Sequence, residues 1–168
     1  MVLLRNLLRL IVVFILISSA PLGVQSKYNH NSITISEIKE KVDFKVLSPN
    51  WVPNNWTLEI KTYPWGEKDN ITHFRLHFMD KDDNYLMIGI EEKKASEGIE
   101  KQKPNTEKIN INGNIGYFHE WANSGKLDRN GNLTSGGRLS WIQEGTYIEM
   151  DSLNVEKDKM IEFASSMK

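Results

Sequence analysis

The sequence predicts an α+β domain, in which a curved antiparallel sheet of six to seven strands has N- and C-terminal helices packed on one face. Three observations carry this prediction. Apolar and polar residues alternate over several short segments, as they do in half-buried strands. The gaps between these segments hold turn-forming residues, which is typical of hairpins. Apolar residues at helical spacing occur near the two ends of the same region.

The predicted domain covers residues 35–168 and follows a polar spacer at 27–34. Its first element is a short helix over 36–42, for which Ser36 is the expected N-cap. An extended segment at 44–47 then leads into a proline-containing loop, because residues that precede proline are kept out of helical backbone conformations.

The middle of the chain carries the strand signals. Seven segments are predicted as strands: 56–62, 73–78, 86–90, 109–111, 115–118, 139–143 and 147–150. The pairs Asn112-Gly113 and Glu144-Gly145 each separate two of these segments, so they predict two tight hairpins.

Two longer gaps and a final helix complete the prediction. The polar stretches at 95–108 and 123–137 are expected to be loops, since both are rich in charged or turn-forming residues. The chain closes with a helix over about 155–167, with Asn154 as its candidate N-cap.

The composition excludes several classes of protein. The chain has 168 residues, with 21 Lys and Arg against 22 Asp and Glu, so its net charge is −1. This balance offers no electrostatic attraction for nucleic acid. The chain also contains no cysteine, which excludes disulfides, thiolate metal sites and lipidation through cysteine.

The N-terminus predicts export. Arg5 and Arg9 precede an apolar run at 10–17, and small residues follow, which is the pattern of a secretory signal peptide over 1–26. Cleavage is expected after Ser26. Cleavage after Ala20 is the alternative, although proline would then be the first residue of the mature chain.

An uncleaved signal anchor stays open as a second interpretation. The uncharged stretch at 10–24 has about 15 residues, whereas a spanning helix needs roughly 20, and the two arginines could lengthen it by snorkelling. In that case the N-terminal segment contacts the membrane. Both interpretations predict an extracytoplasmic domain, either secreted or held at the outer face of the cell membrane.

The histidines and acidic residues do not form a recognisable metal motif. His73 and His77 lie four residues apart on a predicted strand, a separation of about 13 Å that prevents them from sharing one ion. The acidic turn that starts at Asp80 imitates a calcium loop but has Tyr85 where the sharp turn requires glycine. No metal and no cofactor are therefore expected.

Catalytic motifs are equally incomplete. Ser36-x-x-Lys39 resembles a serine–lysine pattern but lacks its companion motifs. A cell-envelope hydrolase would need His119 beside a carboxylate such as Glu120 or Glu149. The sequence alone favours a protein that is not an enzyme, with the hydrolase as a less favoured alternative.

One predicted surface mixes cations with apolar groups. It is the face of the first long hairpin opposite the helices, a combination typical of a binding surface. We therefore identify five residues as candidates for a ligand or partner surface: His73, Arg75, His77, Tyr85 and Met87.

Three ordered motifs resemble a known family. They are FKVLSPNWVPNNW at 44–56, WIQEGTYI at 141–148, and Leu153 followed by MIEFASSM at 160–167. Together they resemble a bacterial extracytoplasmic domain of unknown function, found in stand-alone exported proteins and as the outer part of anti-sigma-factor-like membrane proteins of Gram-positive spore formers. The resemblance covers 35–168.

These observations predict a non-enzymatic, exported binding or sensing domain of the bacterial cell envelope. Its expected partner is an envelope protein or an apolar ligand. One alternative is a carrier or sensor of a lipid-like ligand that lies on the open face of the sheet.

Overall fold

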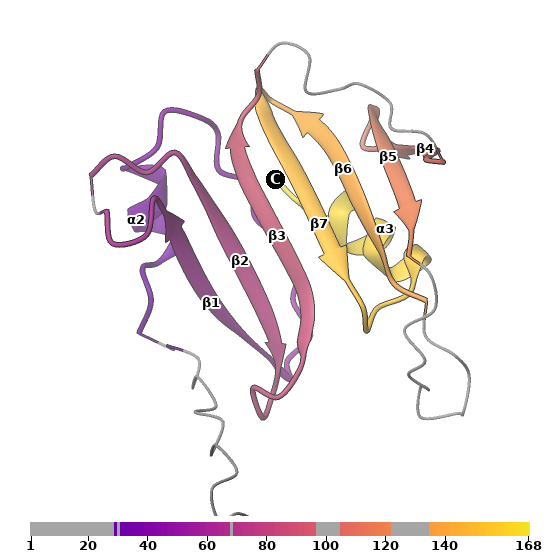
Figure 1. Cartoon of the computed structure of the whole chain (residues 1–168), viewed down its shortest axis with the longest axis horizontal. Helices are drawn as coiled ribbons and strands as arrows, with labels where there is room; N and C mark the ends of the chain where they lie inside the picture. The colour runs from indigo at the N-terminus through magenta and orange to yellow at the C-terminus, as the bar shows by residue number, and fades with distance from the viewer. Residues whose placement is uncertain (1–28, 30, 68, 97–104, 122–134) are drawn as a thin grey trace, which may run out of the picture.

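The computed structural model describes residues 29, 31–67, 69–96, 105–121 and 135–168. They form a seven-stranded antiparallel sheet with the order β1-β2-β3-β7-β6-β5-β4 (Figure 1). The strands are β1 (Trp56–Tyr63), β2 (His73–Asp80), β3 (Leu86–Lys94), β4 (Glu107–Ile111), β5 (Asn114–Glu120), β6 (Gly137–Gln143) and β7 (Thr146–Ser152). Two short helices, α2 (Ile35–Lys39) and α3 (Lys157–Ser165), accompany the sheet. The predicted α+β class and the antiparallel sheet are confirmed, and the sheet has seven strands where six to seven were expected.

The strand order joins two halves of the chain at the centre of the sheet. The first three strands are consecutive neighbours, and the chain then continues at the far edge with β4 and returns to the centre with β7. The central pair therefore brings together residues far apart in the sequence, such as Gly89 on β3 and Asp151 on β7.

Both hairpins predicted from glycine-containing pairs are confirmed. Asn112 and Gly113 have φ values of 53° and 86°, and Glu144 and Gly145 have φ values of 50° and 80°. Two successive positive φ values define the turn whose twist matches that of the flanking strands, and glycine adopts the second value without steric cost.

The β2–β3 connection contains a bulge that strict alternation does not foresee. Phe78 pairs with Ile88, whereas Met79 pairs with Leu86, so Met87 is an extra residue without a partner across the ladder. A bulge of this kind changes the direction of the side chains around it. Alternation along the strand is therefore not sufficient to assign Met87 to one face of the sheet.

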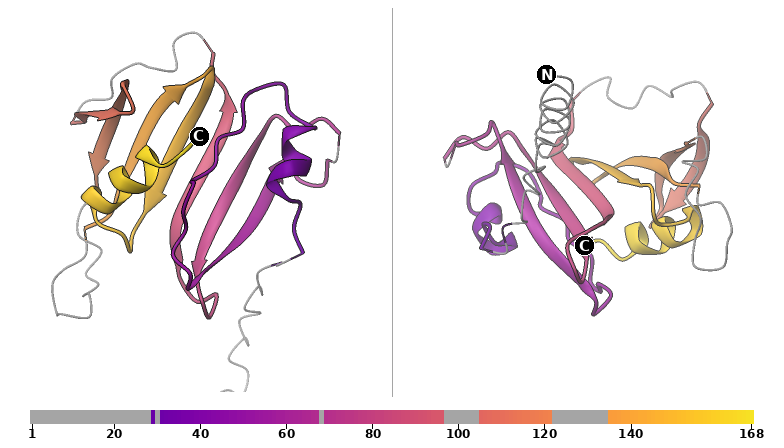
Figure 2. Two further views of the ribbon diagram at one scale, coloured as in Figure 1. Left: turned by 180° about the vertical axis from the view of Figure 1, so that it is seen from behind. Right: turned by 60° about the horizontal axis from the view of Figure 1, so that its bottom comes forward.

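One side of the sheet carries the core. Figure 2 shows that the sheet is curved and that both helices lie on the same side of it. The buried apolar side chains include Ile38 of α2, Phe163 of α3 and many strand residues, among them Phe74, Leu76, Phe78, Ile90, Leu139, Trp141 and Ile148. Burial of each such side chain stabilises the fold by roughly 1.5–3 kcal/mol.

Residues 44–50 cross this buried side without joining the sheet. The backbone N–H of Leu47 donates to the Glu92 carboxylate on β3, and the Thr146 hydroxyl on β7 donates to the carbonyl of Lys45. Ser48 and Lys168 exchange two backbone hydrogen bonds of 3.0 Å. The predicted extended segment thus ties the centre of the sheet to the C-terminus.

The first helix begins earlier than predicted and is shorter. Its N-cap is Thr34 and not Ser36, because the Thr34 hydroxyl accepts from the N–H of Glu37 and the Glu37 carboxylate accepts from the N–H of Thr34. Ser36 has Lys39 three residues later, so it could not form the same reciprocal pair. Thr34, at the end of the predicted spacer, therefore belongs to the folded domain.

The closing helix is also shorter, and its N-cap is Glu156 instead of Asn154. The hydroxyl of Ser152 accepts from the N–H groups of Asn154 and Val155, and the Asn154 amide donates to the carbonyl of Leu86. Asn154 thus binds β3 and stays outside the helix. After the last turn of the helix, Lys168 pairs with Ser48 through backbone hydrogen bonds, so the helix does not continue to 167.

The predicted signal peptide at 1–26 lies outside the described residues, as do 97–104 and 123–134 of the two predicted loops. Within the part of the chain that is described, no helix combines the length and apolar character needed to span a membrane.

Candidate functional site

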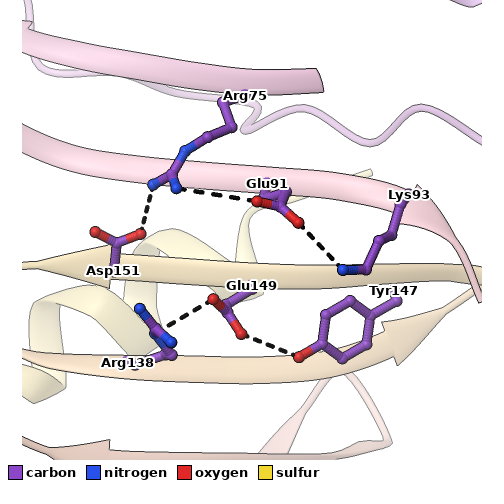
Figure 3. A network of polar contacts seen from close by, with 7 residues as sticks. All are labelled: Arg75, Glu91, Lys93, Arg138, Tyr147, Glu149 and Asp151. Atoms are coloured by element: carbon purple, nitrogen blue, oxygen red, sulfur yellow. Dashed lines mark hydrogen bonds and ion pairs between the residues drawn. The ribbon is translucent and has the colours of Figure 1, made fainter. Parts of the chain in front are cut away.

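A network of charged side chains lies on the face of the sheet opposite the helices (Figure 3). It extends over four adjacent strands and has seven members: Arg75 on β2, Glu91 and Lys93 on β3, Arg138 on β6, and Tyr147, Glu149 and Asp151 on β7. Alternation along each strand places these residues on one face, while their neighbours in sequence point into the core. In the described part of the chain, neither helix covers this face (Figure 1).

The register of β3 and β7 places two carboxylates next to each other, and cations of the network compensate their charges. Glu91 and Glu149 lie directly opposite each other on β3 and β7, and like charges in this position destabilise a sheet. Each carboxylate has its own cation. Glu91 forms ion pairs with Lys93 at 3.2 Å and Arg75 at 3.9 Å, and Glu149 forms one with Arg138 at 3.3 Å.

Arg75 and Tyr147 extend these contacts across the strands. Arg75 Nη2 on β2 donates to Asp151 Oδ1 on β7 at 2.7 Å. This charge-assisted hydrogen bond crosses β3, the strand between them. The Tyr147 hydroxyl donates to Glu149 Oε2 at 3.1 Å, and the Lys93 ammonium lies 5.1 Å from the centre of the Tyr147 ring. The network therefore holds its long side chains in defined positions.

Gly89 is what allows Arg75 to reach Asp151. Gly89 pairs with Asp151, and a Cβ atom added to it would lie only 2.8 Å from Arg75 Nη2. The guanidinium group therefore occupies the space that any other residue would fill with its side chain. A side chain at this position would require the Arg75 guanidinium to shift.

Burial sets the protonation of several groups on this face. Burial, followed by the charges of Lys61 and Arg75, lowers the pKa of His77 to about 4, so this imidazole is neutral at pH 7. Burial and the nearby Glu149 raise the pKa of Tyr147 to about 12, so its hydroxyl remains a donor. Burial raises the pKa of Asp151, and Arg75 opposes this shift.

The five residues identified from the sequence have different positions. Arg75 is the member of the network on β2, at one edge of the network, and His77 lies two residues further along the same strand, opposite Gly89. His73 stacks on the ring of Tyr63 at 4.7 Å, at the start of β2. Tyr85 is an exposed residue of the β2–β3 turn, and Met87 is the bulge residue. Neither of the last two contributes to the network.

Sequence reasoning missed six members of the network: Glu91, Lys93, Arg138, Tyr147, Glu149 and Asp151. Alternation in the last predicted strands places Tyr147 and Glu149 on one face, which is the only signal available for them. Nothing local indicates that β3 and β7 are neighbours, because their paired residues lie far apart in the sequence, as Gly89 and Asp151 do.

A second candidate site is an apolar pocket on the helix side, at the start of α3. Its volume is about 330 Å³, and it is lined by Trp51, Pro53, Trp56, Ile88, Asn154, Val155, Glu156, Lys159 and Phe163. The ring of Phe163 lies 5.5 Å from that of Trp51 and 5.8 Å from that of Trp56. Three aromatic rings therefore meet at one cavity, and Trp51 is 40% exposed there.

The contacts described for the residues considered for a hydrolase are with other groups. A ring nitrogen of His119 lies 3.2 Å from the carbonyl oxygen of Asn105, and Glu149 is occupied by Arg138 and Tyr147. No group of three or more His, Asp or Glu side chains suited to a metal ion is found among the described residues.

Comparison with known proteins gives one match. The family described as "Domain of unknown function (DUF4367)" matches residues 46–167, which include all seven strands and α3. No curated protein and no solved structure matches the chain. The expected domain of unknown function is thus confirmed, whereas its extracytoplasmic, anti-sigma-factor-like setting stays a prediction. Because the match covers most of its length, the chain belongs to the DUF4367 family of domains of unknown function.

Proposed function

We propose that this chain is an exported, non-enzymatic domain of the bacterial cell envelope that binds a partner protein through the open face of its sheet. Export is supported by the basic residues Arg5 and Arg9, the apolar run at 10–17 and the small residues that follow. In this proposal the two helices form a backing layer on the core side and leave the other face to the partner.

The observation that carries the proposal is the row of paired charges on an uncovered face. Arg75 and Asp151 expose only 26% and 17% of their side chains, although neither α2 nor α3, the two helices of the described residues, lies on this face. Side chains that are already held lose little conformational entropy on binding. Arginine and tyrosine, both present here, are also the residue types that most often dominate binding at protein interfaces.

The charge pattern favours a protein over other partners. Three cations (Arg75, Lys93, Arg138) balance three carboxylates (Glu91, Glu149, Asp151), so the network has no net charge to attract a polyanion. A purely apolar ligand would remove water from these charges without replacing it, which is costly. An apolar ligand therefore fits the aromatic pocket on the opposite side better than the open face.

Site-specific photo-crosslinking tests the proposal. The full chain is produced in a Gram-positive host with a photoreactive amino acid in place of Lys93, on the open face. In a matched variant the same amino acid replaces Glu162, which is exposed on α3. We expect a discrete adduct with one envelope protein from the first position and none from the second. Equal adducts from both positions, or none from either, would contradict the proposal.

Gly89→Ala makes the test specific for the network. The added methyl group displaces the Arg75 guanidinium from Asp151, so the adduct at position 93 should fall at least severalfold. Arg75→Gln removes the same charge without crowding the backbone and should give the same loss. A circular dichroism spectrum like that of the parent protein shows that each variant is folded. An adduct that is insensitive to both substitutions would mean that the network has only a structural role.

A further inference from the structure

We propose that the aromatic pocket at the start of α3 binds an ammonium group carried on an apolar body. The pocket is lined by residues of α3 and of the core, away from the open face, so this inference does not depend on the proposed protein partner. It concerns a second site, for a small organic cation.

The walls of the pocket define the apolar part of the ligand. Trp51, Trp56 and Phe163 supply three rings, and Pro53, Ile88 and Val155 complete the apolar lining. At roughly 30 Å³ for each water-sized group, a volume of about 330 Å³ accommodates about ten non-hydrogen atoms. This is the size of a phenyl or branched alkyl group with a short chain.

The polar residues of the pocket favour a ligand that donates hydrogen bonds. Lys159 is already paired with Glu162, at 2.6 Å. Asn154 uses its amide N–H on the carbonyl of Leu86, which leaves its amide oxygen as an acceptor. Glu156 is exposed at the N-cap and makes no capping hydrogen bond through its side chain. The groups that remain for a ligand are thus a carboxylate and an amide oxygen.

Aromatic faces strengthen the preference for a cation. A positive group over the face of tryptophan is attracted by the ring electrons, and the attraction increases when water is excluded. The register adds negative charge at the same end of the sheet. Trp56 pairs with Asp80, where the acidic β2–β3 turn begins (Figure 1). The aromatic rings of the pocket, the Glu156 carboxylate and the acidic β2–β3 turn therefore all favour an organic ammonium ion.

Two features of the pocket oppose this preference and decide the choice of probes. The first N–H groups of α3 form the partially positive end of a helix dipole, and Lys159 is cationic, so both would attract an anion. Three probes with one apolar body and different charge separate these effects: 4-phenylbutylamine, 4-phenylbutan-1-ol and 4-phenylbutanoate.

Nuclear magnetic resonance of the indole N–H groups gives a readout for each tryptophan. The full chain, produced with its own N-terminal segment, is titrated with each probe, and the Trp51, Trp56 and Trp65 signals are assigned with single Trp→Phe variants. We expect the amine to shift the Trp51 and Trp56 signals but not that of Trp65, which is 76% exposed outside the pocket. The amine should bind about tenfold more tightly than the alcohol, and the carboxylate most weakly.

Glu156→Gln and Asp158→Asn form the matched pair of variants. Both remove one carboxylate from exposed positions at the start of α3, but only Glu156 lines the pocket. Glu156→Gln should reduce the tenfold difference between the amine and the alcohol severalfold, because the aromatic rings still favour the cation, and Asp158→Asn should leave the tenfold difference intact. Equal affinities in the parent protein, tighter binding of the carboxylate, or unshifted Trp51 and Trp56 signals would overturn the inference. Crosslinking at position 93 is independent of these results, so the two proposals fail separately.

Discussion

Glu92 is an ionisable side chain with no exposed surface, inside the apolar core. Its Oε2 accepts the backbone N–H of Leu47 at 3.0 Å, and its Oε1 is buried without a hydrogen-bond partner among the described residues. Burial raises the pKa of Glu92 to about 8, and the Leu47 hydrogen bond and the charge of Lys39 oppose the shift only in part. The carboxyl group is therefore largely protonated at pH 7.

This burial predicts that the protein loses stability as the pH rises. Between the ordinary pKa of 4.5 and the folded value of about 8, the folded state binds more protons than the unfolded state. The stabilising contribution of the neutral carboxyl is complete below pH 4.5 and is lost through pH 8. Glu92→Gln cannot ionise, so urea unfolding should show a variant more stable than the parent at pH 9, by roughly a few kcal/mol.

The same comparison at pH 4 is the internal control, since Glu92 is then mostly neutral in both the folded and the unfolded state and the two stabilities should be close. Parallel stability curves from pH 4 to pH 9 would mean that the pKa of Glu92 is not raised in the folded state. At the residue scale, the sequence shows a Glu-Glu pair in a strand, and alternation puts one of the two in the core. Only the structure shows that residues 44–50 cover Glu92.

At the scale of single elements, α2 depends on its cap. The helix has five residues, and a helix of this length has little intrinsic stability in water. Two hydrogen bonds between Thr34 and Glu37 close its first turn, at 2.8 and 3.3 Å. Ile38, which is fully buried, then attaches the helix to the core.

Thr34→Ala should therefore destabilise the protein, by about 1 kcal/mol, because the N–H of Glu37 loses its acceptor. Ser36→Ala is the control. Ser36 is exposed within the helix and caps nothing, so this substitution should leave the free energy of unfolding unchanged or slightly higher. Chemical denaturation of both variants measures the difference. A larger loss from Ser36→Ala than from Thr34→Ala would contradict the observed cap.

The elements that were predicted correctly are those with local signals. Asn112-Gly113 and Glu144-Gly145 adopt the left-handed backbone that their turns require, and each turn is decided by the residues within it. The ends of both helices were predicted wrongly, since Asn154 and Ser36 are good caps in isolation. Asn154 binds a distant strand instead, and this competition is not visible in its own segment.

At the scale of the whole molecule, the predicted signal peptide at 1–26 can be tested directly. If 1–26 is a signal peptide, the exported protein should begin at Lys27, and intact-mass spectrometry of the protein recovered outside the cell would show this. Replacing Arg5 and Arg9 with Glu should reduce export, because the basic end of a signal stays on the cytoplasmic side. A chain that retains Met1 at the cell surface would identify an uncleaved anchor, and one that begins at Pro21 would identify cleavage after Ala20.

The sequence by itself determined the α+β class, the seven strands and the two tight hairpins. It also pointed to Arg75 and His77 as members of an open face. These properties depend on alternation and turn chemistry within a few residues, so a short window is sufficient to read them. The DUF4367 match at 46–167 agrees with the motifs that suggested a domain of unknown function.

Only the tertiary structure decided which surfaces exist. The Arg75–Asp151 contact joins residues 76 positions apart, across a strand whose Gly89 leaves room for it. The aromatic pocket combines the loop at Trp51, the start of β1 and the first turns of α3. The choice among distant pairings depends on which arrangement buries the most apolar surface while keeping every charge paired. That balance is a property of the whole chain, and no local pattern contains it.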